Sequence, residues 1–150
     1  MTTNQKGAIA ETAIVHAATK RGVAVLKPVS DERYDLVFDF RPRLVRVQCK
    51  WVARKESVII VRSYSSRRNA DGFLKSFYKR DEVDAIAAYC AELDRCYFLP
   101  LERFRGHSGI RLRLEAARNN QRVNINWAQD FDFERLDWSA LGAVAQLGER

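Results

Sequence analysis

Apolar and polar residues alternate in short runs over the first half of the chain, a pattern typical of half-buried β-strands. Runs rich in β-branched and aromatic residues cover residues 23–29, 34–40, 44–52 and 58–61. The segment Arg41-Pro42-Arg43 predicts the turn between the second run and the third. We therefore expect a meander of antiparallel strands.

A pattern of longer period precedes these strands and predicts a helix from Gln5 to Lys20, which Gly22 ends. Glu11 lies three and four residues before Ile14 and Val15, so it shares the apolar side of this helix. A carboxylate in such a place is costly unless another group pairs with it. The alternative is a glutamate at the boundary of the apolar face, which reaches solvent past short alanines.

The second half of the chain is less regular. In the segment 62–80, serine and basic residues interleave with aromatic ones, and we expect an exposed loop with a short helix. Residues 83–89, 96–101 and 110–114 predict further strands, and residues 128–136 predict a brief helix. The predicted order is a helix, a β-meander, and then mixed strands and helices.

The run 44–52 carries polar residues on one face only. Since the period of a strand is two, Val45, Val47, Cys49 and Trp51 share one face, and Arg46, Gln48 and Lys50 share the other. The apolar face predicts core. A row of polar groups on a strand bounded by apolar runs indicates that this face lines a cleft.

Asp35 begins the neighbouring run and can approach Gln48 and Lys50 across the sheet, and Glu11 can join them from the helix. Oxygen ligands select Mg²⁺, which takes one or two carboxylates from a protein. We expect Asp35 as a direct ligand, Gln48 and the backbone carbonyl of Cys49 as neutral ligands, and Glu11 as a ligand directly or through water. Lys50 would hold or deprotonate an attacking water and stabilise the transition-state charge. Spacing alone leaves open a simple salt bridge from Asp35 to Lys50.

Composition adds a polyanionic partner to this picture. The 150 residues suffice for one domain with a real core, and the formal net charge is +7 with a pI near 9.6. We expect a nucleic acid as the partner, held mostly through its phosphates. The residues expected to bind it are Arg46, Arg54, Lys55, Arg62, Tyr64, Arg67, Arg68, Lys75, Lys79, Arg80, Arg111 and Arg113. The alternative is a solvated basic face.

The three cysteines, Cys49, Cys90 and Cys96, fit no zinc spacing and predict buried thiols in a reducing cytoplasm. No apolar run approaches the roughly 20 residues of a membrane helix, so we expect no membrane partner. A cytoplasmic protein that associates with the nucleoid when bound to DNA is the expectation.

Glu11, Tyr34-Asp35 and Gln48-Cys49-Lys50 together resemble the PD-(D/E)xK nuclease signature, and the glutamine variant resembles group I intron-encoded homing endonucleases. The resemblance implies an α/β fold, a restriction-endonuclease-like mixed β-sheet core flanked by helices in the order α-β-β-β-α-β. The nuclease domain would span residues 1–136, with a tail at 137–150. Tyr34 replaces the proline of the motif, and Gln48 replaces its usual acid, so we expect a single metal ion.

The expected activity is Mg²⁺-dependent, site-specific cleavage of double-stranded DNA, and the resemblance implies 5′-phosphate and 3′-hydroxyl ends. One small domain makes few base contacts, so we expect a homodimer or homotetramer. The alternatives are a Holliday-junction-resolving or repair nuclease of similar fold, and a DNA-binding protein without catalytic activity.

Overall fold

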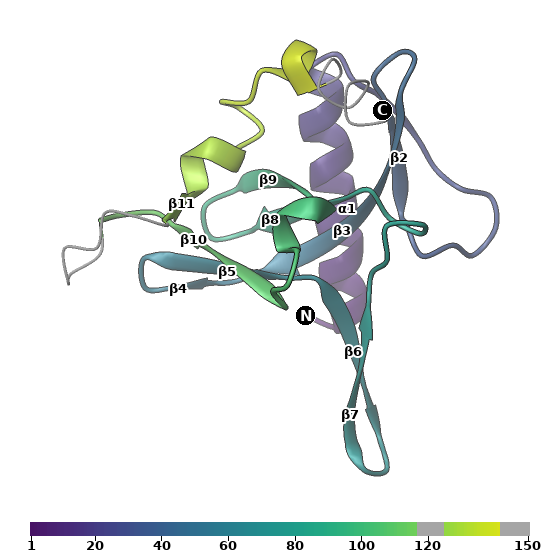
Figure 1. Ribbon diagram of the computed structural model, residues 1–150, viewed down its shortest axis with the longest axis vertical. Helices are drawn as coiled ribbons and strands as arrows, with labels where there is room; N and C mark the ends of the chain where they lie inside the picture. Colours follow the sequence, from purple (N-terminus) through teal and green to yellow (C-terminus); the bar gives the residue numbers. More distant parts are fainter. Residues whose placement is uncertain (117–124, 142–150) are drawn as a thin grey trace.

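The computed structural model describes residues 1–116 and 125–141, apart from the side chain of Arg68. Its first layer is helix α1 (Thr3–Lys20), which packs on one face of a central sheet (Figure 1). Thr2 caps the helix: its hydroxyl accepts from the Gln5 N–H, and the Gln5 side chain accepts from the Thr2 N–H. The predicted helix is confirmed, and this capping box starts it two residues earlier than expected.

The central sheet has five strands in the order β1-β2-β3-β8-β9. Their bounds are Ala24–Leu26, Leu36–Asp39, Leu44–Val52, Ala85–Cys90 and Arg95–Pro100. The pairs β1–β2, β2–β3 and β8–β9 are antiparallel, whereas β3 and β8 are parallel. The mixed α/β sheet is confirmed, and so are the first three strands of the predicted meander, whereas the fourth run, 58–61, belongs to a second sheet.

A second sheet of four strands covers the other face of the central sheet, in the order β11-β10-β5-β4. Its strands are β4 (Arg54–Lys55), β5 (Val58–Arg62), β10 (Gly109–Arg113) and β11 (Asn126–Trp127). Two 3₁₀ turns follow, η1 (Leu101–Phe104) and η2 (Ala128–Phe131), and residues 138–141 are helical. Only the short turn η2 occupies the region 128–136, where we expected a helix.

Two apolar clusters lie on opposite faces of the central sheet. One contains Ile14 of α1 with Val45 and Val47 of β3, and the other contains Val52 of β3 with Ile59 of β5. Every residue of β8 is buried, and its alternate residues serve the two clusters. A strand buried on both faces reads as a continuous apolar run, as Ala85–Cys90 does.

Strands β6 (Tyr64–Asn69) and β7 (Gly72–Phe77) form a hairpin that projects from both sheets (Figure 1). We call Tyr64–Phe77 the arm. The expected loop with a short helix in the segment 62–80 is therefore wrong, as is the helix expected between the third strand and the next core strand. The turn has its own chemistry: the Asp71 N–H donates to the Asn69 side chain at 3.0 Å, and Gly72 has a φ of +121°.

The end of the described chain packs on the core rather than standing apart. The indole N–H of Trp138 donates to the Phe133 carbonyl at 2.9 Å, and the indole lies near Phe38, Phe40 and Phe98. Residues 142–150 of the predicted tail lie outside the described residues, so the division at residue 136 stays a prediction. Within the described part of the chain, no helix is long and apolar enough to cross a membrane.

Candidate active site

Asp35 and the polar face of β3 meet where β2 begins. The Asp35 N–H donates to the Val47 carbonyl at 2.9 Å, and Asp35 Oδ2 accepts from the Cys49 N–H at 2.9 Å. The structure therefore brings Asp35 beside Gln48-Cys49-Lys50, as its spacing predicts. The contact is made by the backbone of β3, so the register of the antiparallel pair positions the carboxylate.

Lys50 does not pair with Asp35. Among the described residues no ion pair joins them, and Lys50 Nζ donates instead to the Tyr64 carbonyl at 2.6 Å. Burial, together with the charges of Arg62 and Arg33, lowers the pKa of Lys50 to about 8. The simple salt bridge from Asp35 to Lys50, which spacing left open, is thus absent. The Lys50 side chain is half-buried near the cations Arg33 and Arg62.

The carboxylate of Asp35 is poorly compensated. Burial raises its pKa above the ordinary range, the Cys49 N–H opposes that shift, and the nearby charge of Glu11 adds to it. Lys27 and Lys50 lower the pKa of Asp35 only as smaller influences. A carboxylate in this state favours a bound cation.

Glu11 finds the partner that its place on the helix requires. Lys27, one residue beyond β1, lies 2.5 Å from a Glu11 carboxylate oxygen, and the Glu11 side chain is only 24% exposed. Lys27 was missed by sequence reasoning, although a carboxylate on an apolar helix face demands a cation. The influence of Glu11 on the pKa of Asp35 brings the two carboxylates into one electrostatic neighbourhood.

The donor set fits a hard divalent cation. The Gln48 amide nitrogen lies 3.5 Å from the Cys49 carbonyl oxygen, beside the Asp35 carboxylate that accepts from the Cys49 N–H. Within the described part of the chain, no group of three or more His, Cys, Asp and Glu side chains gathers as a metal site. Two carboxylates, an amide oxygen and a main-chain carbonyl remain, which are the oxygen ligands that Mg²⁺ takes.

Cysteine chemistry contributes nothing to this site. All three cysteines are free, Cys90 and Cys96 are buried, and Cys49 is half-buried against the cluster of α1. Burial raises the pKa of the Cys49 thiol, and it raises that of Cys96 to about 12. The thiols of Cys49 and Cys96 are therefore protonated at neutral pH.

The arm carries basic and aromatic side chains on a two-stranded ribbon. Its register pairs Tyr64 with Phe77 and Ser66 with Lys75, so these four side chains share one face. The rings of Tyr64 and Phe77 are 5.2 Å apart, and Lys75 Nζ lies 4.7 Å from the Tyr64 ring. Arg67 lies on the other face of the arm, and the Arg68 side chain lies outside the described residues.

Other predicted DNA-binding residues surround the arm and the second sheet. Arg54 and Lys55 form the exposed edge strand β4, Arg62 ends β5, and Lys79 follows the arm. Three more are Arg80, Arg111 and Arg113, of which Arg80 lies 3.9 Å from Glu102 and Arg113 donates to the Glu115 carbonyl. Their contact with DNA stays a prediction.

Arg46 is engaged within the protein. Its guanidinium donates to both carboxylate oxygens of Asp84 at 3.0 Å, and to the carbonyls of Asp81 and Arg80. The Arg46 N–H also donates to Asp84 Oδ2 at 2.8 Å. These bonds involve each nitrogen of the guanidinium, so Arg46 joins β3 to the segment that leads into β8, and its contact with DNA stays a prediction.

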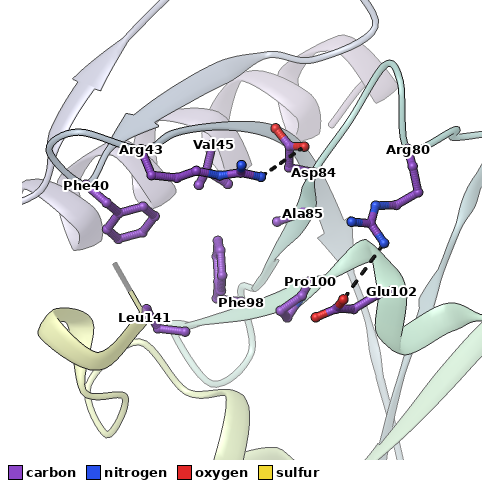
Figure 2. A pocket seen from close by; sticks show the side chains of 10 residues that line it. All are labelled: Phe40, Arg43, Val45, Arg80, Asp84, Ala85, Phe98, Pro100, Glu102 and Leu141. Carbon is purple, nitrogen blue, oxygen red and sulfur yellow. Dashed lines mark ion pairs between the residues drawn. The ribbon is translucent and has the colours of Figure 1, made fainter. Parts of the chain in front are cut away.

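A cavity of about 130 Å³ lies apart from these groups, where the chain near Leu141 meets the central sheet (Figure 2). Phe40 and Phe98 line its apolar side, and Arg43 lies 3.8 Å from Asp84 on its polar side. None of the candidate catalytic residues lines it. This cavity is a gap in the packing around Asp84 and is not the candidate site.

Comparisons with known proteins agree on one class. A family model described as PD-(D/E)XK endonuclease matches residues 1–134. The solved structure of a bacterial homing endonuclease, I-Ssp6803I, is similar with a TM-score of 0.71 and 28% sequence identity. That match covers 99% of this chain and 97% of the other. No curated protein matches the sequence.

Proposed function

Since the chain belongs to the PD-(D/E)XK endonuclease family and is a nuclease, we propose that it cuts double-stranded DNA at a specific site in a Mg²⁺-dependent reaction, as a homing endonuclease. The observation that carries the proposal is the hydrogen bond from the Cys49 N–H to Asp35 Oδ2. This bond places the Asp35 carboxylate, whose charge its neighbours balance only weakly, beside Gln48 and Lys50 and near the base of the basic arm. Family membership favours this reading over a DNA-binding protein without catalytic activity.

The oxygens of Asp35, Gln48, Glu11 and the Cys49 carbonyl are the proposed ligands of Mg²⁺. When bound, the ion supplies Lewis-acid stabilisation of charge on the phosphate. A neutral amide in place of a second motif acid makes the site less anionic, which supports a single ion. The Glu11–Lys27 pair keeps the charge of Glu11 partly balanced before the ion binds.

Lys50 is the proposed group that orients or deprotonates the attacking water. It lies one residue from Cys49 and faces the same side of β3 as Gln48. Attack at phosphorus breaks the bond to the 3′-oxygen, so the proposed products carry 5′-phosphate and 3′-hydroxyl ends. As a cation, Lys50 would also stabilise the charge that develops on the phosphate oxygens.

The arm is the proposed reader of sequence. A major groove admits a two-stranded β-ribbon, and the arm presents basic side chains on both faces. Tyr64, Arg67, Arg68 and Lys75 are its candidates for base contact. The basic residues around it, Arg54, Lys55, Arg62, Lys79, Arg80, Arg111 and Arg113, would hold phosphates and set the register.

Assembly and location belong to the same proposal. One arm spans few base pairs, and two strands must be cut, so we propose a homodimer or homotetramer related by symmetry. A DNA substrate and a net charge of +7 support a place on the nucleoid in the cytoplasm.

The decisive experiment uses supercoiled plasmid libraries with Mg²⁺ and the full chain. The wild type should cut a defined site, chelation with EDTA should stop cutting, and Asp35→Asn or Lys50→Met should slow it by about 10²-fold or more. Both variants should still bind the site in a gel-shift assay, because phosphate contacts dominate affinity.

Cutting by either variant at the wild-type rate would contradict the assigned site. Selective cutting of four-way junctions, with no preferred linear site, would replace the homing reading by a junction-resolving one. Activity that is unaffected by EDTA would remove the metal from the proposal.

A further inference from the structure

The arm lacks a third strand to stabilise it. In the described part of the chain, β6 and β7 pair only with each other. An isolated two-stranded hairpin is marginal in water, so its base needs support. The main chain supplies some of it, through bonds from the Ser63 N–H to the Ser108 carbonyl and from the Tyr78 N–H to the Ser63 carbonyl.

Two cations from the catalytic side of the molecule hold the base as well. Lys50 Nζ donates to the Tyr64 carbonyl at the start of β6. Arg33 Nη2 donates to the Ser76 and Phe77 carbonyls at the end of β7, both at 3.2 Å. Each strand of the arm is therefore bonded to a side chain that borders the candidate site.

Tyr78 lies between these two cations. Arg33 Cζ is 4.5 Å and Lys50 Nζ is 5.1 Å from the centre of its ring, which is nearly buried. The nearest carboxylate that pairs with Arg33 is Glu82, at 3.9 Å from Nε. Among the described residues this buried Nε has no hydrogen-bond partner. The arm carbonyls and the Tyr78 ring therefore fix the guanidinium more closely than any carboxylate does.

Arg33 also lies two residues before Asp35. We propose that Arg33 is a positioning residue that registers the arm on the catalytic centre: with Lys50 and Tyr78 it clamps the two strands of the arm, so that the arm and Lys50 move as one body. Its role in cutting rests on the proposed function, because it requires that the arm engages DNA. Arg33 acts through Tyr78 and the arm, and it does not touch the scissile phosphate.

Amide hydrogen exchange and single-turnover cleavage test this on the full chain. Arg33→Met should speed exchange of amides in the arm by about tenfold, the effect of losing roughly one net hydrogen bond, and leave β8 amides protected. The cleavage rate should fall by about tenfold, while the Kd for DNA and its salt dependence stay unchanged. Arg33→Lys should restore part of both, since it keeps a cation over Tyr78 and one donor.

The matched control is Arg103→Met, which also removes an arginine stacked on an aromatic ring, 5.2 Å from Phe131 and outside the arm. It should leave arm exchange and cutting unchanged. If Arg33→Met loses β8 protection and so unfolds, Arg33→Lys carries the test, because loss of one donor should still loosen the arm selectively.

Unchanged arm exchange in Arg33→Met overturns the proposal whether or not the protein cuts DNA. A raised Kd with a salt slope smaller by about one would make Arg33 a phosphate contact and also overturns it. If the wild type cuts no DNA, the proposed function is wrong instead. The exchange result would still decide whether Arg33 holds the arm.

Discussion

At the scale of single residues, the role of each charged side chain depends on whether a group of opposite charge pairs with it. Glu11 pairs with Lys27, Arg46 pairs with Asp84, and Asp35 receives only an N–H. Buried charges require partners, so Asp35, a half-buried carboxylate that no ion pair balances among the described residues, is expected to take up a metal. The same comparison distinguishes Arg46, whose guanidinium bonds Asp84 and two carbonyls, from the exposed arginines of the second sheet and the arm.

The Arg46–Asp84 pair yields a prediction on stability. Two guanidinium bonds and one N–H bond hold the pKa of Asp84 below its ordinary value of 3.8, despite its burial. Asp84→Asn should therefore lower the free energy of unfolding at pH 7 by about 2 kcal/mol, measured by urea unfolding. Glu102→Gln is the control, because Glu102 is half exposed and its ion pair to Arg80 spans 3.9 Å.

The effect of Asp84→Asn should depend on pH in one direction. A depressed pKa in the folded state means that the stabilisation is complete above 3.8 and is lost as pH falls through the folded value. The gap between wild type and variant should thus narrow on acidification and stay constant from pH 5 to 8. A gap that widens on acidification contradicts the assignment.

At the scale of elements, the arm is the feature that departs most from sequence expectation. None of its strand residues whose side chains the structure describes belongs to either apolar cluster, and Phe73 and Leu74 near its turn are exposed. Hairpin residues that lie outside the core carry no amphipathic pattern, so periodicity could not identify them. The turn Asn69-Ala70-Asp71-Gly72 was the available signal.

Shortening the arm is expected to separate binding from folding. Replacing residues 67–74 by Asn-Gly joins Ser66 to Lys75 with a two-residue hairpin turn. Specific DNA binding should weaken by about 10²-fold or more, because base contacts are lost. The melting temperature should stay close to that of the wild type. Unaltered specificity would show that the arm does not read the site.

At the scale of the whole molecule, helix, central sheet and second sheet stack around β8. Ala85, Ala87 and Tyr89 face the helix side, whereas Ile86, Ala88 and Cys90 face the second sheet. The layers form a rigid base, the candidate site lies where β2 begins beside β3, and Lys50 of β3 bonds the start of the arm. A rigid base is what holds catalytic groups to useful geometry.

Self-association is the prediction at this scale. Sedimentation of the full chain at micromolar concentration should give a dimer or tetramer, and a specific duplex should bind an even number of copies. A cut in both strands within one binding event follows from the two-fold symmetry. A monomer that binds the duplex one to one would contradict this assembly.

The sequence by itself determined the local and periodic features: helix α1, the meander β1–β3, the two faces of β3, and the proximity of Asp35 to Gln48-Cys49-Lys50. These follow from the period of each element and from a short turn, which act between near neighbours in the chain. It also indicated the family through Glu11, Asp35 and Lys50, which the family match confirms.

Only the tertiary structure decided which groups pair over long separations. The contacts of Arg46 with Asp84, of Lys50 with Tyr64 and of Arg33 with the end of β7 join residues 14 to 44 positions apart. No periodic pattern in the sequence relates such residues. Their contact depends on the pairing of β8 with β3 and on where the base of the arm meets the core. The physical reason is that packing and burial, not spacing, choose the partner of each charge.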